Sequence, residues 1–147
     1  MEAILFIGLQ ASGKSSFYKE KFFSTHIRLN LDMLRTRHRE RLFLNACLQA
    51  KQRFVIDNTN PSKDDRARYI PAILEAGFDM TGYYFSSRLS DCLGRNARRV
   101  AAQQVPEMGL RGCSARLEFP SYQEGFSRLF FVTLADGDFQ VDEWKDE

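Results

Sequence analysis

The sequence predicts an α/β protein with an open parallel sheet of about five strands, helices on both faces and a helical lid. Two observations carry this expectation. Short apolar runs alternate with helix-like stretches along the chain, and the links between them are short. The first apolar run leads directly into a glycine-rich segment, Gly8–Ser15, that opens a helix. In such sheets ligand sites lie at the carboxyl ends of the strands.

Each element has its own local signal. Runs rich in aliphatic, β-branched and aromatic residues predict strands at Ala3–Ile7, Ile27–Leu29, Arg53–Ile56, Asp79–Phe85 and Leu129–Leu134. The intervening stretches predict helices at Lys14–Phe23, Asp32–Gln52, Lys63–Ala76 and Ser90–Ala102, with a short helix within Gly112–Phe119. Ser62 is the expected N-cap of the third helix and Gly77 its expected C-cap. We expect Gln103–Gly112 to be irregular and mobile.

The chain consists of a long basic part and a short acidic C-terminal part. At 147 residues it is long enough for one domain with a real core, which we place at residues 1–135. Residues 136–147 hold six acidic residues against one lysine, a net charge of −5, and are expected to form an acidic C-terminal tail that is either a loose end or pinned by Phe139, Val141 and Trp144. Because the whole chain carries +2, residues 1–135 carry +7. Arginines gather around residues 35–41 and 88–116, where they either bind phosphates or form solvated helix faces.

The three cysteines suggest the compartment. Cys47, Cys92 and Cys113 show no C-x-x-C spacing, and the chain has only two histidines, so we expect buried, reduced thiols and no zinc site. No apolar stretch approaches membrane-spanning length, and the N-terminus does not resemble a signal peptide. We therefore expect a cytoplasmic protein.

The segment Gly8–Ser15 fits the phosphate-binding loop pattern G-x-x-x-x-G-K-[ST]. A strand that feeds such a turn directs backbone N–H groups at one point, and the following helix adds its positive N-terminal end. Lys14 can reach the β- and γ-phosphates of a nucleotide, and the Ser15 hydroxyl can bind Mg²⁺. ATP and Mg²⁺ are the cofactors that this pattern predicts.

Two aspartates follow later strands and can complete such a site. Asp32 comes after the second strand, where a carboxylate can orient an acceptor hydroxyl and take its proton, or can simply favour the first turn of a helix. Arg35, one turn later, can clamp an acceptor phosphate or stay solvated. Asp57 ends the third strand, where it can help to hold Mg²⁺ through water, or can only close the turn together with Asn58 and Asn60.

The stretch Arg95–Arg99 follows the fourth strand and runs into the irregular segment. Arginines on a helix beside a flexible segment fit a lid over the nucleotide, where one of them neutralises the transferred phosphoryl group. The alternative is an exposed basic helix.

With these residues in view, the chain resembles the kinase domain of 5′-hydroxyl polynucleotide kinases, both the phage type and the animal DNA-repair type, as far as about Val132. The resemblance rests on the phosphate-binding loop and on an N-x-D-x-x-R segment at Asn30–Arg35. It also rests on more specific segments, namely Phe54–Pro61, Arg66–Ile70, Arg95–Arg99 with Val105-Pro106, Leu117–Pro120 and Glu124–Phe126.

This resemblance implies transfer of the γ-phosphate of ATP to the 5′-OH end of DNA or RNA. Asp32 would be the general base, Arg35 would contact the acceptor phosphate, and Arg99 or Arg98 would act from the lid. Ser15 and Asp57 would hold Mg²⁺. The residues expected to contact the nucleotide are Gly8, Gln10, Ala11, Ser12, Gly13, Lys14, Ser15, Ser16, Arg95 and Arg98.

Two other functions are compatible with these residues. One is a P-loop kinase for a small hydroxyl compound such as a sugar or a nucleoside. The other is a non-catalytic nucleotide-binding module, which would have no need of an acceptor-side base at Asp32. The acceptor is therefore the open question that the sequence leaves.

Overall fold

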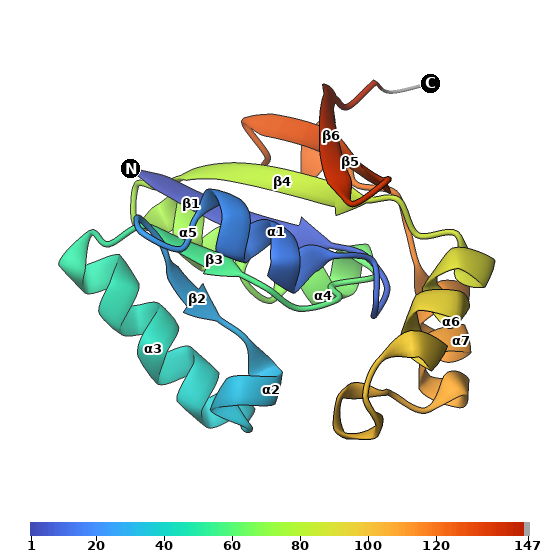
Figure 1. The fold of residues 1–147 in the computed structure, drawn as a ribbon. Coiled ribbons are helices and arrows are strands. Elements are labelled where there is room, and N and C mark those ends of the chain that lie inside the picture. The colour runs from blue at the N-terminus through green and yellow to red at the C-terminus, as the bar shows by residue number, and fades with distance from the viewer. Residues whose placement is uncertain (146–147) are drawn as a thin grey trace.

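The computed structural model describes residues 1–145 and has a six-stranded sheet in the order β2-β3-β1-β4-β5-β6 (Figure 1). The first five strands run parallel, and β6 pairs antiparallel with β5. The strands are β1 Glu2–Ile7, β2 Ile27–Leu29, β3 Phe54–Ile56, β4 Asp79–Phe85, β5 Arg128–Ala135 and β6 Asp138–Glu143. The predicted parallel α/β sheet is confirmed, and it has one strand more than expected.

The central strand, β1, is apolar on both faces because helices cover both. Ala3, Leu5 and Ile7 point into one core cluster, together with residues of α3 and α5. Ile4 and Phe6 point into the other, where Phe17 of α1 packs. A strand buried on both sides needs a continuous apolar run rather than an alternating one, and the sequence supplies it.

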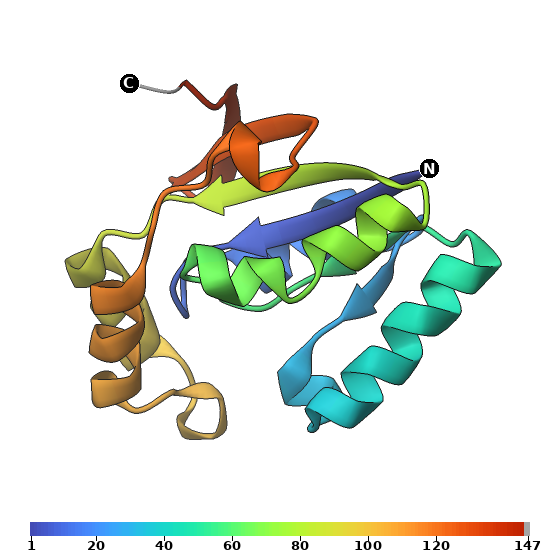
Figure 2. The ribbon, with the colours of Figure 1, turned by 180° about the vertical axis from the view of Figure 1, so that it is seen from behind.

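The α-helices are α1 Lys14–Lys21, α2 Leu31–Leu34, α3 Arg37–Ala50, α4 Lys63–Ala67, α5 Ile70–Glu75, α6 Leu89–Arg98 and α7 Glu107–Arg116. Figures 1 and 2 show α1 on one face of the sheet, α4 and α5 on the other, and α6 and α7 beyond the carboxyl ends of β1 and β4. The longest helix, α3, has 14 residues. Within residues 1–145, no helix is long and apolar enough to cross a membrane.

Two helices that the sequence predicted as continuous are each broken in two. The expected helix Asp32–Gln52 stops at Arg35, whose φ is 78°, and restarts at Thr36, whose hydroxyl accepts a hydrogen bond from the Arg39 N–H at 3.1 Å. The expected helix Lys63–Ala76 breaks before Pro71, because proline has no N–H for the preceding turn. Its predicted N-cap, Ser62, does form a capping box.

The segment Gln103–Gly112 is more regular than expected. A 3₁₀ turn at Ala101–Gln103 ends where this segment begins, and α7 starts within the segment at Glu107, after Pro106. A small core of Leu9, Cys92, Leu110 and Cys113 packs α6 against α7 and against the glycine-rich loop. The two thiols thus act as small apolar groups between α6 and α7, and they are buried and free, as is Cys47.

The expected acidic tail is not a loose end over residues 138–143, where β6 closes the sheet. Its acidic residues stay exposed, while Phe139 turns inward and its ring lies 5.1 Å from that of Phe17. The sequence did not predict this strand because its acidic residues are typical of a solvated tail. They are compatible with β6 because it is an edge strand whose side chains other than Phe139 face water. The last two residues of the predicted tail, 146 and 147, lie outside the described part of the chain.

Candidate active site

The glycine-rich loop Gly8–Ser15 lies at the carboxyl end of β1, beside the point where the strand order reverses. Gly13, the N-cap of α1, has a φ of 99°, a conformation that side chains disfavour. At Gly8, a Cβ atom would lie 3.0 Å from the Cβ of Phe85. Ala11 takes a φ of 64° although it is not a glycine, at a cost of about 1 kcal/mol. The loop is therefore held in one preformed shape, as anion-binding loops require.

The Lys14 side chain folds back over this loop. Its Nζ donates hydrogen bonds to the carbonyl oxygens of Gly8 at 3.0 Å and Leu9 at 2.6 Å. Burial lowers the pKa of Lys14 from 10.5 to about 8, although the nearby Asp57 partly opposes this effect. An ammonium group desolvated in this way gains strongly when a phosphate approaches it.

Ser15 and Asp57 meet as the sequence predicted. The Ser15 hydroxyl donates a hydrogen bond to Asp57 Oδ2 at 3.1 Å, and the Asp57 side chain is only 1% exposed. A hydroxyl and a carboxylate oxygen at this distance are the hard oxygen donors that Mg²⁺ prefers, so these two residues fit the metal. The sequence did not predict a third member, Arg28 of β2, which contacts both of them at 2.8 Å and 2.9 Å.

Asp32 lies in the first turn of α2, with its side chain exposed. The position of this turn is set by Asn30, whose side chain accepts a hydrogen bond from the Met33 N–H and donates one to the Asp57 carbonyl at 2.6 Å. The Leu31 N–H adds a bond to Asn58 Oδ1 at 2.9 Å. The start of α2 is thus attached to the end of β3, which carries Asp57.

The arginines of the predicted lid take three different positions. Arg95 donates a hydrogen bond to the Ala11 carbonyl at 2.7 Å and so holds the glycine-rich loop. Arg99 lines the same cleft as Lys14, and its charge helps to lower the pKa of Lys14, after burial as the main cause. Arg98 is exposed and is not part of the cleft wall, and the same holds for Arg35 on the opposite side.

These parts enclose a cleft of about 300 Å³. The loop forms its floor with Gln10, Ala11, Lys14 and Ser15. One wall comes from α2 and the end of β3, including Asp32 and Asp57, and the other from the α6–α7 connection, including Arg99 and Gln103. Among residues 1–145, Gln10 Oε1 is buried without a hydrogen-bond partner. An unpartnered acceptor on a residue that lines a cleft fits a site that receives a ligand or water.

Behind this wall lies a buried polar network that the sequence did not reveal. Glu40 of α3 is 2% exposed and accepts hydrogen bonds from the Asn58 amide at 3.0 Å and the Tyr69 hydroxyl at 3.0 Å. Arg37 donates to the same carboxylate at 2.9 Å. Burial, followed by the charge of Glu40, raises the pKa of Tyr69 to about 12. The network fixes Asn58, and through it the start of α2.

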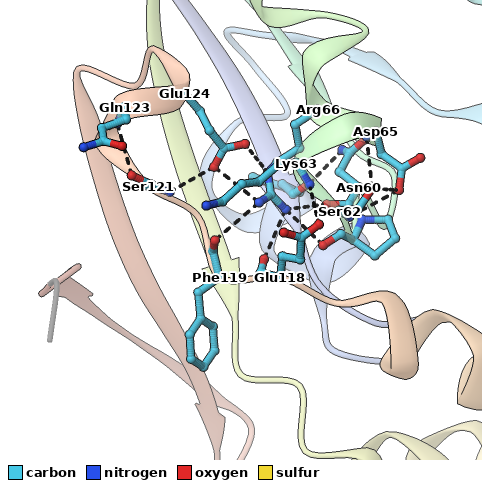
Figure 3. A network of polar contacts seen from close by, with 12 residues as sticks. Asn60, Ser62, Lys63, Asp65, Arg66, Glu118, Phe119, Ser121, Gln123 and Glu124 are labelled. Atoms are coloured by element: carbon cyan, nitrogen blue, oxygen red, sulfur yellow. Dashed lines mark hydrogen bonds and ion pairs between the residues drawn. The ribbon is translucent and has the colours of Figure 1, made fainter.

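Figure 3 shows a second buried network, centred on Arg66 of α4, which has no exposed surface. Its guanidinium binds the carbonyl oxygens of Asn60 at 2.9 Å and Glu118 at 3.2 Å, and it pairs with Glu124 at 2.8 Å. The network therefore joins the loop after β3 to the segment before β5. The signal for it was present in the specific segments around residues 57–61, 66–70 and 117–126, but their contact is not visible in a sequence.

Comparison with known proteins agrees with this geometry. Residues 36–120, more than half of the chain, match the family model described as "AAA domain". The matched range includes Asp57 and Arg99 and begins after the glycine-rich loop.

A curated relative, the bifunctional polynucleotide phosphatase/kinase of Schizosaccharomyces pombe, is 25% identical over 132 residues. The match covers 87% of this chain, which spans about a third (32%) of the length of that relative.

Two solved structures have the same fold at low sequence identity. The crystal structure of Kti12 from Chaetomium thermophilum, in complex with ADP-AlF3, superposes with a TM-score of 0.68 at 16% identity and covers 91% of this chain and 90% of its own. A gluconokinase from Sinorhizobium meliloti 1021 superposes with a TM-score of 0.61 at 18% identity, over 92% of this chain and 83% of its own. The family match, the sheet order and the loop together lead to one conclusion: the chain belongs to the AAA-domain family and has the nucleotide-binding fold of the P-loop kinases.

Proposed function

We propose that this chain is an ATP-dependent kinase that transfers the γ-phosphate to the 5′-OH end of DNA or RNA. The observation that carries the proposal is that Asp32 lines the same cleft as Lys14 and Ser15. A nucleotide sensor needs only the loop, whereas phosphoryl transfer to an alcohol also needs a carboxylate that orients the hydroxyl.

On the donor side, the loop binds the ATP phosphates through its backbone N–H groups. Lys14 then exchanges its carbonyl partners, Gly8 and Leu9, for phosphate oxygens. Ser15 and Asp57 would hold Mg²⁺, which would supply compensation of the phosphate charge. Arg95 keeps the loop in shape through the Ala11 carbonyl.

On the acceptor side, Asp32 accepts the proton of the attacking hydroxyl, and Arg99 stabilises negative charge on the transferred phosphoryl group from the facing wall. Arg35 lies outside the cleft and exposed, at the end of α2, where it can contact a phosphate of a polymer that extends beyond the site. Arg39 of α3 is also exposed, and it lies near the end of α2, where its Nη1 donates a hydrogen bond to the Leu34 carbonyl at 3.5 Å. A polynucleotide acceptor agrees with this arrangement and with the name of the curated relative.

The decisive experiment supplies γ-labelled ATP and a 5′-OH oligonucleotide, DNA in one arm and RNA in the other. We expect a 5′-labelled product from the wild type. Asp32→Asn, which keeps the size of the side chain, should lower kcat by about 10²–10⁴-fold with ATP affinity retained. Asp64→Asn on α4, an exposed aspartate in a helix first turn outside the cleft, is the matched control.

A second candidate is a kinase for a small hydroxyl compound, which is favoured by the modest cleft of about 300 Å³ and by the gluconokinase among the similar structures. The dependence of acceptor affinity on salt concentration distinguishes the two candidates, because the affinity of an acceptor bound through several phosphates falls steeply as the ionic strength rises. Transfer to a sugar or nucleoside, without transfer to any oligonucleotide end, would replace the first proposal with the second. ATP binding with no transfer to any hydroxyl would leave a non-catalytic nucleotide-binding module.

A further inference from the structure

Arg28 holds both of the residues that fit a metal ion. Its Nε donates to Asp57 Oδ2 at 2.8 Å, and its Nη2 donates to Ser15 Oγ at 2.9 Å. The guanidinium lies 6.0 Å from the centre of the Tyr18 ring, and the Arg28 side chain is 27% exposed. A cation of the chain itself therefore compensates the charge of the buried Asp57 carboxylate.

This arrangement cannot persist unchanged when a divalent metal binds. A guanidinium has five N–H donors and no lone pair, so it cannot serve as a metal ligand. Two cations beside the same carboxylate would also repel each other, and water screens this repulsion little because the Asp57 side chain is only 1% exposed. We propose that Arg28 is a built-in counter-cation that competes with the divalent metal for Ser15 and Asp57 and withdraws when metal and nucleotide bind together.

The competition gives the site a specific property. A metal ion that binds without nucleotide has to displace the two charge-assisted hydrogen bonds of Arg28, and it finds only Ser15 and Asp57 to hold it. A metal that arrives with a nucleotide also brings phosphate oxygens as ligands, and these compensate for the loss. The partial exposure of Arg28 lets its head group move into water without crossing the packed core. The metal site is thus formed chiefly in the presence of nucleotide.

This inference rests on the metal and nucleotide half of the proposed function and is independent of the acceptor. Its test measures Mn²⁺ binding to the full chain by electron paramagnetic resonance, with and without ADP, so that no catalytic turnover is involved. Three variants accompany the wild type: Arg28→Gln, Arg28→Lys and Arg53→Gln. Arg53 is an exposed arginine just before β3, and its replacement removes the same charge away from the metal ligands.

We expect Arg28→Gln to bind Mn²⁺ roughly tenfold more tightly than the wild type in the presence of ADP, and to bind it measurably without ADP. The Mn²⁺ affinity of Arg28→Lys should lie between those of the wild type and Arg28→Gln, because lysine keeps the charge but cannot make the two-point contact of a guanidinium. Arg53→Gln should match the wild type. In metal-free buffer, Arg28→Gln should also have a lowered Tm, which Mg²⁺ restores, because Asp57 is otherwise left buried and unpaired.

Equal Mn²⁺ affinity in the wild type and Arg28→Gln, or a weaker affinity in the variant, would overturn the inference. A gain as large in Arg53→Gln would overturn it too, since the effect would then come from net charge alone. Failure of Mn²⁺ to bind any variant in the presence of ADP would remove the metal assignment of Ser15 and Asp57, and with it both this inference and that part of the proposed function.

Discussion

Arg66 and Glu124 form an ion pair at 2.8 Å across 58 residues of sequence, and the arginine side chain has no exposed surface. The same guanidinium binds main-chain carbonyls on both sides of the contact, at Asn60 and Glu118. A buried charge is tolerated only when it is paired and fully hydrogen-bonded, and Arg66 meets both conditions. The pair fixes the loop after β3, and this loop carries the cleft residues Asp57 and Asn58.

Arg66→Met is therefore expected to destabilise the fold by about 3 kcal/mol or more, because it leaves the Glu124 carboxylate and several buried carbonyls without their partner. The matched control is Arg116→Met, since Arg116 pairs with Asp65 at the same 2.8 Å but its side chain is 62% exposed. That pair should contribute no more than about 1 kcal/mol. Urea unfolding of both variants checks the difference, and equal losses would show that burial does not set the strength of the Arg66 contact.

The pKa of Lys14, lowered by burial to about 8, predicts proton uptake when nucleotide binds. Phosphates raise that pKa again, so binding at pH 8 should take up roughly half a proton. Calorimetry at this pH, in buffers of different ionisation enthalpy, measures the uptake. Lys14→Arg keeps the charge but does not titrate in this range, so it should show none. The same uptake in both proteins would exclude Lys14 as the group responsible.

The same shift makes a separate prediction about stability. The folded pKa of Lys14 lies below its ordinary value of 10.5, so the cost of burying the charge is fully present below pH 8 and is relieved as the pH rises toward 10.5. Lys14→Met should therefore raise the Tm at pH 7, where ~1 kcal/mol corresponds to roughly 4 °C for a domain of this size. The gain should shrink between pH 8 and pH 10. A lowered Tm at pH 7 would contradict the prediction.

The sequence predicts the parts of this protein that depend on local patterns. The loop Gly8–Ser15 and the strands that precede Asp32 and Asp57 have short-range signals. Because parallel strands end at one edge of the sheet, these residues necessarily meet there. The structure places Lys14, Asp32 and Asp57 around one cleft, as that reasoning expects, and Arg99, which follows α6, lines the facing wall.

What the sequence could not supply are contacts between distant positions. The bond from Arg28 to Asp57 spans 29 residues, and that from Tyr69 to Glu40 also spans 29. Nothing in the sequence distinguishes these two residue pairs from ordinary polar surface residues. Pro71 is a missed local signal, since a proline at the second position of a helix indicates a new start rather than a continuation.

Arg99 lies in the cleft wall and Arg98 is exposed outside it, so we propose Arg99 as the lid arginine that acts on the transferred phosphoryl group. Arg99→Ala should lower kcat by about 10³-fold, which is the effect of removing an arginine that stabilises the transferred phosphoryl group. Arg98→Ala should have a much smaller effect. Arg111→Ala, which removes an exposed arginine of α7 paired with Glu107, controls for lost positive charge. Steady-state kinetics with the acceptor that the labelling experiment finds measures these effects, and a larger loss for Arg98→Ala would reverse the assignment.

Phe139 connects β6 to the nucleotide site, because its Cε1 lies 3.1 Å from the position of a Cβ built on Gly13. Its ring also packs edge-on against Phe17 of α1, at 5.1 Å between centres. Phe139→Ala should therefore cost about 2 kcal/mol of stability and also weaken ADP binding, since it removes the packing behind the loop. Val141→Ala on the same strand removes a more exposed side chain (Val141 is 40% exposed) and should change both quantities little. Thermal unfolding with and without ADP measures the two effects together. If Phe139→Ala lost stability but kept the full ADP-induced rise in Tm, the strand would support the sheet alone and not the loop.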